Sequence, residues 1–196
     1  RHLIHTMNNT MINISNYIDT KSIKQDITFV YIHRDEKNLY TVATDSYRLA
    51  CIAYPLDTDL YNNINDGYYT VKYFTSLCKD LNAKKSTIID KQNAINSFNA
   101  TKSTLDLKYP EYQQLIKKYQ ENKRTGKVQQ GIIGKYNAKY LIDFIKLSSE
   151  LKDFNIHNIS YKIGDIDILL DITSMDHLPA VYQKDDSYIM LMPLHR

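Results

Sequence analysis

The sequence predicts an α+β fold, built from repeated strand-helix-strands units with antiparallel sheets and with helices on one face. Three segments of the chain share the same order of elements: a strand, a short amphipathic helix, then two or three strands. No exact sequence repeat relates these segments, which indicates structural duplication rather than a copied sequence. Helices that bury an apolar stripe against antiparallel sheets form an α+β arrangement.

The composition indicates one large domain, or one domain and part of another, with a real core. The chain has 196 residues, of which 43% are hydrophobic, and this excludes wholesale disorder. The 25 basic and 22 acidic residues leave a net charge of +3, too small to indicate nucleic-acid binding by itself. Cys51 and Cys78 have apolar neighbours, so we expect no disulfide framework and a reducing compartment. No apolar run reaches about 18 residues, the length of a membrane span.

The first unit is expected to begin with an extended segment at residues 1–9. These residues lack an initiator Met and the apolar core of a signal peptide, so we expect a fragment or a processed chain. Residues 9–20 are predicted to be helical, because Met11, Ile14 and Ile18 share one helical face. Period-two alternation then predicts strands at residues 26–35, 38–46 and 48–56.

The second unit starts with a predicted strand at residues 66–72. The helix at residues 73–83 places Phe74 and Leu77 inward. Three strands are expected after it, at residues 86–92, 94–100 and 103–109.

The third unit is predicted from residue 129 onward. Asn137 is the expected N-cap of a helix at residues 138–151, whose inner face carries Phe144 and Ile145. Strands are expected at residues 159–164, 165–172 and 187–194. Between the second and third units the chain is rich in Lys and Arg, and this segment is the predicted linker.

The motifs for catalysis and for metal or cofactor binding are absent from the sequence. Residues 124–127, RTGK, end like a phosphate-binding loop, but Glu121 replaces the earlier Gly and Val128 replaces the Ser or Thr. The six His residues show no metal-ligand spacing. The alternating acids of residues 165–172, DIDILLDI, fit a half-buried strand better than paired carboxylates. We therefore predict a protein that is not an enzyme and has no cofactor.

Three stretches resemble one protein family, in the right order along the chain. Residues 42–50, VATDSYRLA, resemble the ATDxxRLA segment in the middle domain of the bacterial DNA sliding clamp, the beta subunit of DNA polymerase III. Residues 105–116, LDLKYPEYQQLI, are similar to the segment that closes that middle domain. Residues 187–196, SYIMLMPLHR, resemble the C-terminal strand and its Met-Pro tail. Residues 134–147 also look like the last helix of the third domain.

The resemblance covers nearly the whole chain and implies a DNA-clamp-like fold of reduced size. A family member has three domains of two units each, whereas this sequence has three units in all. The implied organisation is a middle-domain-like part at residues 1–116, a basic linker or collapsed region at residues 117–130, and a C-terminal half-domain at residues 131–196. The first domain and half of the third have no counterpart, so the chain is either a reduced clamp-like protein or incomplete.

The resemblance implies a groove that docks peptides of DNA polymerases and of other replication and repair proteins. Tyr47 stands where His is common, and Ser46 stands where Gly is common. Taken alone, Thr44–Ser46 is also typical of a hairpin turn, and Met192 of a core residue. The matching positions are Ile27, Thr44, Ser46, Tyr47, Arg48, Leu49, Pro110, Gln114, Leu115, Met192, Pro193, Leu194 and His195.

The resemblance further implies a processivity factor that encircles duplex DNA without reading its sequence, as a homo-oligomeric ring placed by a clamp loader. Such a protein is cytoplasmic, in a bacterium or a phage-infected cell. The expected DNA contacts are lysines on outer helix faces, although each is also typical of an ordinary solvated helix. They are Lys21, Lys24, Lys72, Lys79, Lys84, Lys85, Lys139 and Lys146. The alternatives are a clamp-derived peptide-binding adaptor or decoy without a ring, and an unrelated nucleic-acid enzyme, which needs an acidic cluster or metal site that the sequence lacks.

Overall fold

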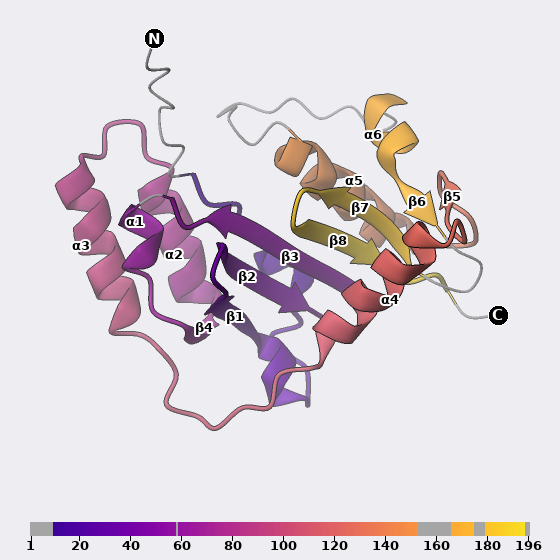
Figure 1. The fold of residues 1–196 in the computed structure, drawn as a ribbon. Coiled ribbons are helices and arrows are strands. Elements are labelled where there is room, and N and C mark those ends of the chain that lie inside the picture. The colour runs from indigo at the N-terminus through magenta and orange to yellow at the C-terminus, as the bar shows by residue number, and fades with distance from the viewer. Residues whose placement is uncertain (1–9, 58, 153–165, 175–178, 195–196) are drawn as a thin grey trace, which may run out of the picture.

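The computed structural model describes residues 10–57, 59–152, 166–174 and 179–194 (Figure 1). In these residues the strands form one antiparallel sheet in the order β4-β1-β2-β3-β8-β7-β6-β5. The strands are β1 (Phe29–Arg34), β2 (Asn38–Thr44), β3 (Arg48–Pro55), β4 (Gly67–Thr70), β5 (Gln129–Gln130), β6 (Thr173–Ser174), β7 (Ala180–Lys184) and β8 (Ser187–Leu191). The helices are α1 (Asp59–Asn62), α2 (Val71–Leu81), α3 (Ile88–Asn99), α4 (Tyr112–Arg124), α5 (Ala138–Lys152) and α6 (Ile166–Asp171), with 3-10 turns η1 (Ser15–Tyr17) and η2 (Gln25–Thr28). This antiparallel α+β architecture confirms the predicted fold class.

The sheet is continuous because β3 and β8 pair with each other. Leu49 lies opposite Met190, and Cys51 lies opposite Tyr188. The strands of the first part of the chain are thereby joined to those of its last part (Figure 1). The pairing brings residues that are far apart in the sequence into one structure.

Side chains alternate along the strands, so the sheet has two distinct faces. Ile52 of β3 and Ile189 of β8 belong to a core that includes Phe74 of α2 and Phe144 of α5. We call this side, which α2, α3 and α5 cover, the helix-covered face. Figure 1 shows α4 on the opposite side of β3 and β8 from α5. The helix α4 packs Tyr112 and Tyr119 on that second side, which we call the α4 face.

The strands expected between residues 86 and 100 are wrong, because this segment folds as α3. Its first turn is held by two reciprocal hydrogen bonds: the Asp90 N–H donates to Oγ1 of Thr87 (3.1 Å) and the Thr87 N–H donates to the Asp90 carboxylate (2.9 Å). Such a capping box starts a helix. Ile95 and Phe98, three residues apart, then bury one side of it. The strand expected at residues 103–109 is also absent from this described segment.

The helix expected over residues 9–20 is also wrong, because only the short turn η1 forms there. Distant side chains bind the backbone of this segment in place of helical bonds. The Met11 N–H donates to Oδ1 of Asn82 (2.9 Å), and Nδ2 of Asn82 donates to the Met11 carbonyl (3.0 Å). The Ile12 N–H donates to the hydroxyl of Tyr54 (3.0 Å). Backbone N–H and C=O groups that already have these hydrogen-bond partners do not require the bonds of a helix.

The strand expected at residues 165–172 is a third correction, because residues 166–171 form α6. Ile168 and Ile172 are both buried, and they are four residues apart, a spacing that fits a helix as well as a strand. The Ile172 N–H donates to the carbonyl of Ile168 (3.2 Å), which is the helical bond. The expected extended segment at residues 1–9 and the expected strand at residues 159–164 lie outside the described residues.

The predicted linker begins inside α4, which continues to Arg124. Tyr112 and Tyr119, seven residues apart, face the sheet, while Lys117 and Lys118 are exposed. A helix on the α4 face was not predicted from the sequence. The division of the chain at residues 117 and 130 stays a prediction.

We expect the protein to become less stable as the pH is lowered from about 7.5 to about 5.5, because His33 takes up a proton less readily in the folded state. His33 hydrogen-bonds to the Tyr112 hydroxyl. Burial lowers the pKa of His33, although the carboxylates of Asp66 and Asp35 act in the opposite direction. The unfolded chain therefore binds a proton first as the pH falls, and stability is lost from the ordinary His pKa downward. Urea unfolding of the wild type and of His33→Gln at both pH values checks this. Equal pH dependence in the two proteins would contradict it.

Candidate peptide-docking site and basic face

The segment between β2 and β3 is a tight turn that its own side chains hold, and we call it the 44–48 turn. Asp45 accepts the N–H groups of Tyr47 (3.0 Å) and Arg48 (2.8 Å) on Oδ1. The Thr44 hydroxyl donates to the carbonyl of Arg48 (2.6 Å). Ser46 has a φ of 75°, a left-handed conformation that glycine adopts more easily. The backbone at Ser46 thus has a conformation that would be less strained with a glycine there.

Arg48 is buried, and its guanidinium is fully engaged inside the protein. It forms ion pairs with Asp45 (2.9 Å) and Asp143 (3.1 Å), the latter from α5. Nη2 also donates to the backbone carbonyl of Asn16 (2.7 Å). The guanidinium lies 4.0 Å from the ring centre of Tyr140 and 4.8 Å from that of Tyr17. Arg48 therefore ties the 44–48 turn to α5 and to η1.

The C-terminal segment lies directly beside the 44–48 turn. The Met192 N–H donates to the carbonyl of Tyr47 (2.9 Å), which extends the β3–β8 pairing by one step. The Leu194 N–H donates to the carbonyl of Lys135 (2.7 Å). Tyr47 is 62% exposed and Leu194 is 55% exposed, so both present apolar surface to the solvent. The two sequence motifs thus meet at one surface.

The remaining predicted groove residues lie elsewhere around β3. Leu49 is buried on the α4 face, where Leu115 of α4 packs against the same cluster. Pro110 and Gln114 are exposed at the start of α4, and Ile27 is buried in η2. Since Arg48 belongs to the helix-covered face and Leu49 to the α4 face, neighbouring predicted residues point to opposite sides of the sheet. His195 lies outside the described residues.

Tyrosines of the third unit complete the surface, and the sequence analysis missed them. The ring centre of Tyr140 lies 6.4 Å from that of Tyr47. A Cβ atom placed at Gly134 would lie 3.8 Å from Pro193 and from the ring of Tyr136. Tyr136 and Tyr140 are four residues apart around the start of α5, a spacing that could have signalled a shared surface.

The eight predicted DNA-contacting lysines are all exposed, and six of them come from one side of the sheet. Two lie on α2 and two on α5, the helices that pack on the helix-covered face, and two more follow α2 directly. Lys21 and Lys24 precede η2. In the part of the chain that the structure describes, no ion pair uses any of the eight. Their charges are therefore available to a phosphate-bearing partner.

Neither cysteine has the lowered pKa of an activated thiol. Burial raises the pKa of the Cys51 thiol to about 12, and it also raises the pKa of Cys78, so both thiols stay protonated at neutral pH. Within the described ranges, no three His, Cys, Asp or Glu side chains gather as a metal site. None of the described helices combines the length and the apolar character needed to cross a bilayer.

Comparison with known proteins gives a structural likeness only. No family model matches the sequence, and no curated protein matches it. The DNA polymerase III beta subunit of Thermotoga maritima is 12% identical, with a TM-score of 0.48 over 97% of this chain and 62% of that chain. The DNA polymerase III beta chain of Streptococcus pneumoniae is 13% identical, with a TM-score of 0.46 and the same two coverages. This chain spans 62% of the length of either protein.

Proposed function

We propose that this chain is a sliding-clamp-like, non-catalytic protein that docks peptides of DNA polymerases and of other replication and repair proteins. One observation carries the proposal. The 44–48 turn and residues 192–194 resemble two separate clamp motifs, and the Met192 N–H donates to the Tyr47 carbonyl. The two motifs resemble the family in separate parts of the sequence, and in the fold they lie at one surface. A docking site built from both motifs requires this proximity.

The chemistry of this surface suits a short peptide with an apolar end. Tyr47 offers an exposed aromatic ring with a polar tip, a residue type that is enriched among binding hot spots. Met192 is half-buried beside it, and a methionine adapts its shape to several partners. Arg48 holds the turn from inside, so its role here is to position Tyr47 rather than to contact the peptide.

Fluorescence polarisation of a labelled peptide with the clamp-binding pattern, Gln-led and hydrophobic-ended, tests the proposal. We expect saturable binding at roughly micromolar strength, and a loss of about tenfold or more in the Tyr47→Ala, Met192→Ala double variant. Tyr73→Ala is the matched control, since Tyr73 is 41% exposed on α2. Equal binding by the double variant and the wild type would refute the site, and no binding by any of them would refute the function.

We propose further that the basic helix-covered face binds duplex DNA without sequence preference, as a processivity factor in a ring placed by a clamp loader. The exposed lysines of α2 and α5 support this, because none of them forms an ion pair with another described residue. Contacts of this kind go to phosphates and weaken steeply with salt. Exchanging Lys72, Lys79, Lys139 and Lys146 for Gln is expected to weaken binding to duplexes of unrelated sequence alike and to reduce the salt dependence. Unchanged binding would contradict the proposal.

One observation favours the second candidate, an adaptor that docks peptides without forming a ring. The sheet ends at β4, and the segment after α3 covers that edge: the Ser103 N–H donates to the Tyr68 carbonyl (2.8 Å). The side chain of Lys102 lies over Gly67, within 2.8 Å of where a Cβ atom would stand. Subunits that join by continuing a sheet need free edge strands, and this edge is occupied.

Sedimentation velocity at high protein concentration separates the two candidates. A closed homo-oligomer supports the ring. A monomer that still binds the peptide supports the adaptor, because a single copy of this sheet does not close on itself.

A further inference from the structure

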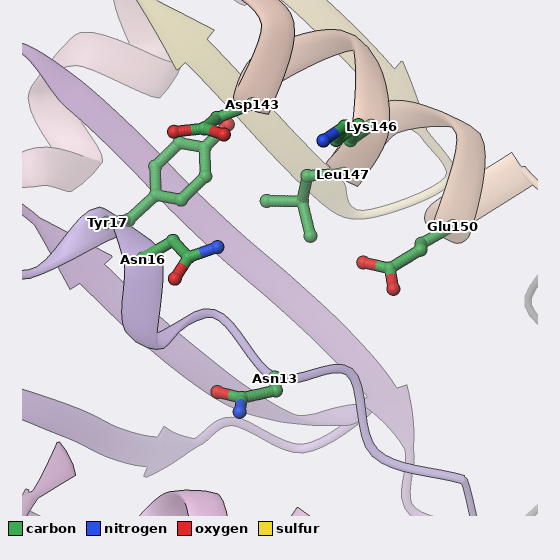
Figure 2. Close-up of a pocket in the computed structure, with 7 residues that line it drawn as sticks. All are labelled: Asn13, Asn16, Tyr17, Asp143, Lys146, Leu147 and Glu150. Carbon is green, nitrogen blue, oxygen red and sulfur yellow. The ribbon is translucent and has the colours of Figure 1, made fainter. Parts of the chain in front are cut away.

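A cleft of about 250 Å³ lies on the helix-covered face, between residues 13–17 and α5. Pockets for drug-sized ligands are usually about 300–1,000 Å³, so this cleft has room for a single flat ring system or a short side chain. Figure 2 shows its lining, which is Asn13, Asn16 and Tyr17 on one side and Asp143, Lys146, Leu147 and Glu150 along α5 on the other.

Tyr17 distinguishes this cleft from an ordinary surface depression. It is 2% exposed, and its hydroxyl has no hydrogen-bond partner among the described residues. Buried hydroxyls in proteins are nearly always paired, so we expect this one to bond to a group that enters the cleft. Burial raises the pKa of Tyr17, so the hydroxyl stays protonated and can donate.

The charges around the cleft balance, which favours a neutral group inside it. Arg48 forms ion pairs with Asp45 (2.9 Å) and Asp143 (3.1 Å), and Lys146 brings the second positive charge against these two carboxylates. Glu150, at the far end of the lining, already has an interaction of its own. A buried charge without a partner is costly, so neither a cation nor an anion gains by entering.

The free hydrogen-bonding groups of the lining match an amide edge, a carbonyl beside an N–H. Arg48 binds Oδ2 of Asp143, which leaves Oδ1 to accept another donor. In Figure 2 the ring of Tyr17 reaches toward this carboxylate. A carboxylate can only accept, whereas the phenol can donate. Leu147 adds an apolar wall for a flat ring.

The lysines beside the cleft indicate which kind of molecule brings that edge. Lys146 lines the cleft, and Lys139 lies two helical turns earlier on α5. Both are exposed, and neither forms an ion pair with a described residue. Lysines of this kind attract phosphates. A molecule that joins a neutral amide edge to a phosphate is a nucleotide that carries thymine or guanine.

We propose that this cleft binds the amide edge of an unpaired thymine or guanine base, in a DNA strand that lies on the helix-covered face. The proposal rests on the DNA-binding role proposed above and adds a base-binding site to it. The Tyr17 hydroxyl donates to the base carbonyl, and the base N–H donates to Oδ1 of Asp143. The base lies on Leu147, and its phosphate lies at Lys146. Adenine and cytosine are disfavoured, because they carry an amino group in place of that carbonyl.

The test is an NMR titration of the whole chain with thymidine and, separately, with 2′-deoxyguanosine. The control probes are 3-methylthymidine, which lacks the N–H, 2′-deoxyadenosine, which lacks the amide edge, and propionamide, which has the edge but no base. Thymidine 5′-monophosphate adds the phosphate. Tyr17→Phe removes only the unpaired hydroxyl, and its urea midpoint checks that it folds. Tyr73→Phe is the matched control, since Tyr73 lies on α2 and does not line the cleft.

We expect saturable shifts of the amides of residues 13–17 and 143–147 with thymidine or 2′-deoxyguanosine. Affinity for the base falls about threefold to tenfold in Tyr17→Phe, as for one lost hydrogen bond, and is unchanged in Tyr73→Phe. Binding of 3-methylthymidine and of 2′-deoxyadenosine is at least tenfold weaker. The monophosphate binds more tightly than thymidine, and Lys146→Gln abolishes that gain.

Three results would overturn the proposal: no saturable shift with either base, equal affinity for thymidine and 3-methylthymidine, or equal affinity in Tyr17→Phe and the wild type. Tighter binding of propionamide than of thymidine would also overturn it and would identify an amide side chain as the ligand. The nucleosides carry no phosphate, so their binding is measured independently of the duplex. Unchanged duplex binding in the lysine variant refutes the DNA-binding face, whereas absent nucleoside binding refutes this cleft.

Discussion

Replacing Arg48 with methionine is expected to lower the free energy of unfolding by about 3–5 kcal/mol. The side chains of Arg48 and Asp45 are 6% and 5% exposed, so their ion pair is almost fully removed from water. Removal of the guanidinium leaves the Asp45 carboxylate buried without its counter-charge. A buried unpaired carboxylate destabilises the fold by more than the intact ion pair stabilises it. Asp143 and the carbonyl of Asn16 lose a partner in the same step.

Urea unfolding at neutral pH measures this loss. Lys37→Met is the matched control, because its pair with Asp186 spans 3.8 Å and the two side chains are 81% and 49% exposed. That variant should change the free energy of unfolding by less than about 1 kcal/mol. A comparably small effect of Arg48→Met would show that the buried pair is not what holds the 44–48 turn. The same variant should also bind the clamp-motif peptide less well, because Tyr47 loses its fixed position.

Replacing Phe144 with alanine should destabilise the protein by about 3–5 kcal/mol. Phe144 is 0% exposed on α5, inside the core of the helix-covered face. The truncation removes the contacts of the ring and leaves a cavity that neighbouring strands can fill only in part. Since α5 packs against β7 and β8, the loss affects the part of the sheet that carries residues 192–194.

The midpoint of urea unfolding gives the size of this effect, provided that the slope stays unchanged. Ile23→Ala is the control, because Ile23 is fully exposed and its truncation should matter by less than about 0.5 kcal/mol. If Phe144→Ala were as mild as Ile23→Ala, α5 would not be part of the core as described.

The strands and helices with a strong apolar period could be predicted from the sequence, and weaker segments could not. β1 alternates, β2 and β3 are short runs buried at most positions, and α2 and α5 each carry a continuous apolar stripe. The failures have specific causes. The capping box of Thr87 and Asp90 outweighs the β-branched Ile88 and Ile89 at the start of α3, and tertiary hydrogen bonds replace a helix around Met11.

The candidate site was predictable only as two unconnected motifs. Periodicity assigns Met192 to a strand, but nothing in the sequence gives the register that places it beside Tyr47. The buried position of Arg48 could not be predicted either, because its partner Asp143 lies 95 residues away in the sequence, on a helix.

The pairing of β3 with β8 has a consequence for how the chain is made. While the ribosome synthesises residues 56–186, β3 has no neighbour on one side, and its free N–H and C=O groups can pair with another nascent chain. Closing such a long loop late in synthesis is slow compared with forming local hairpins. Chaperone binding to nascent chains should therefore persist until β8 emerges, and the yield of folded protein should depend on how quickly that last strand arrives.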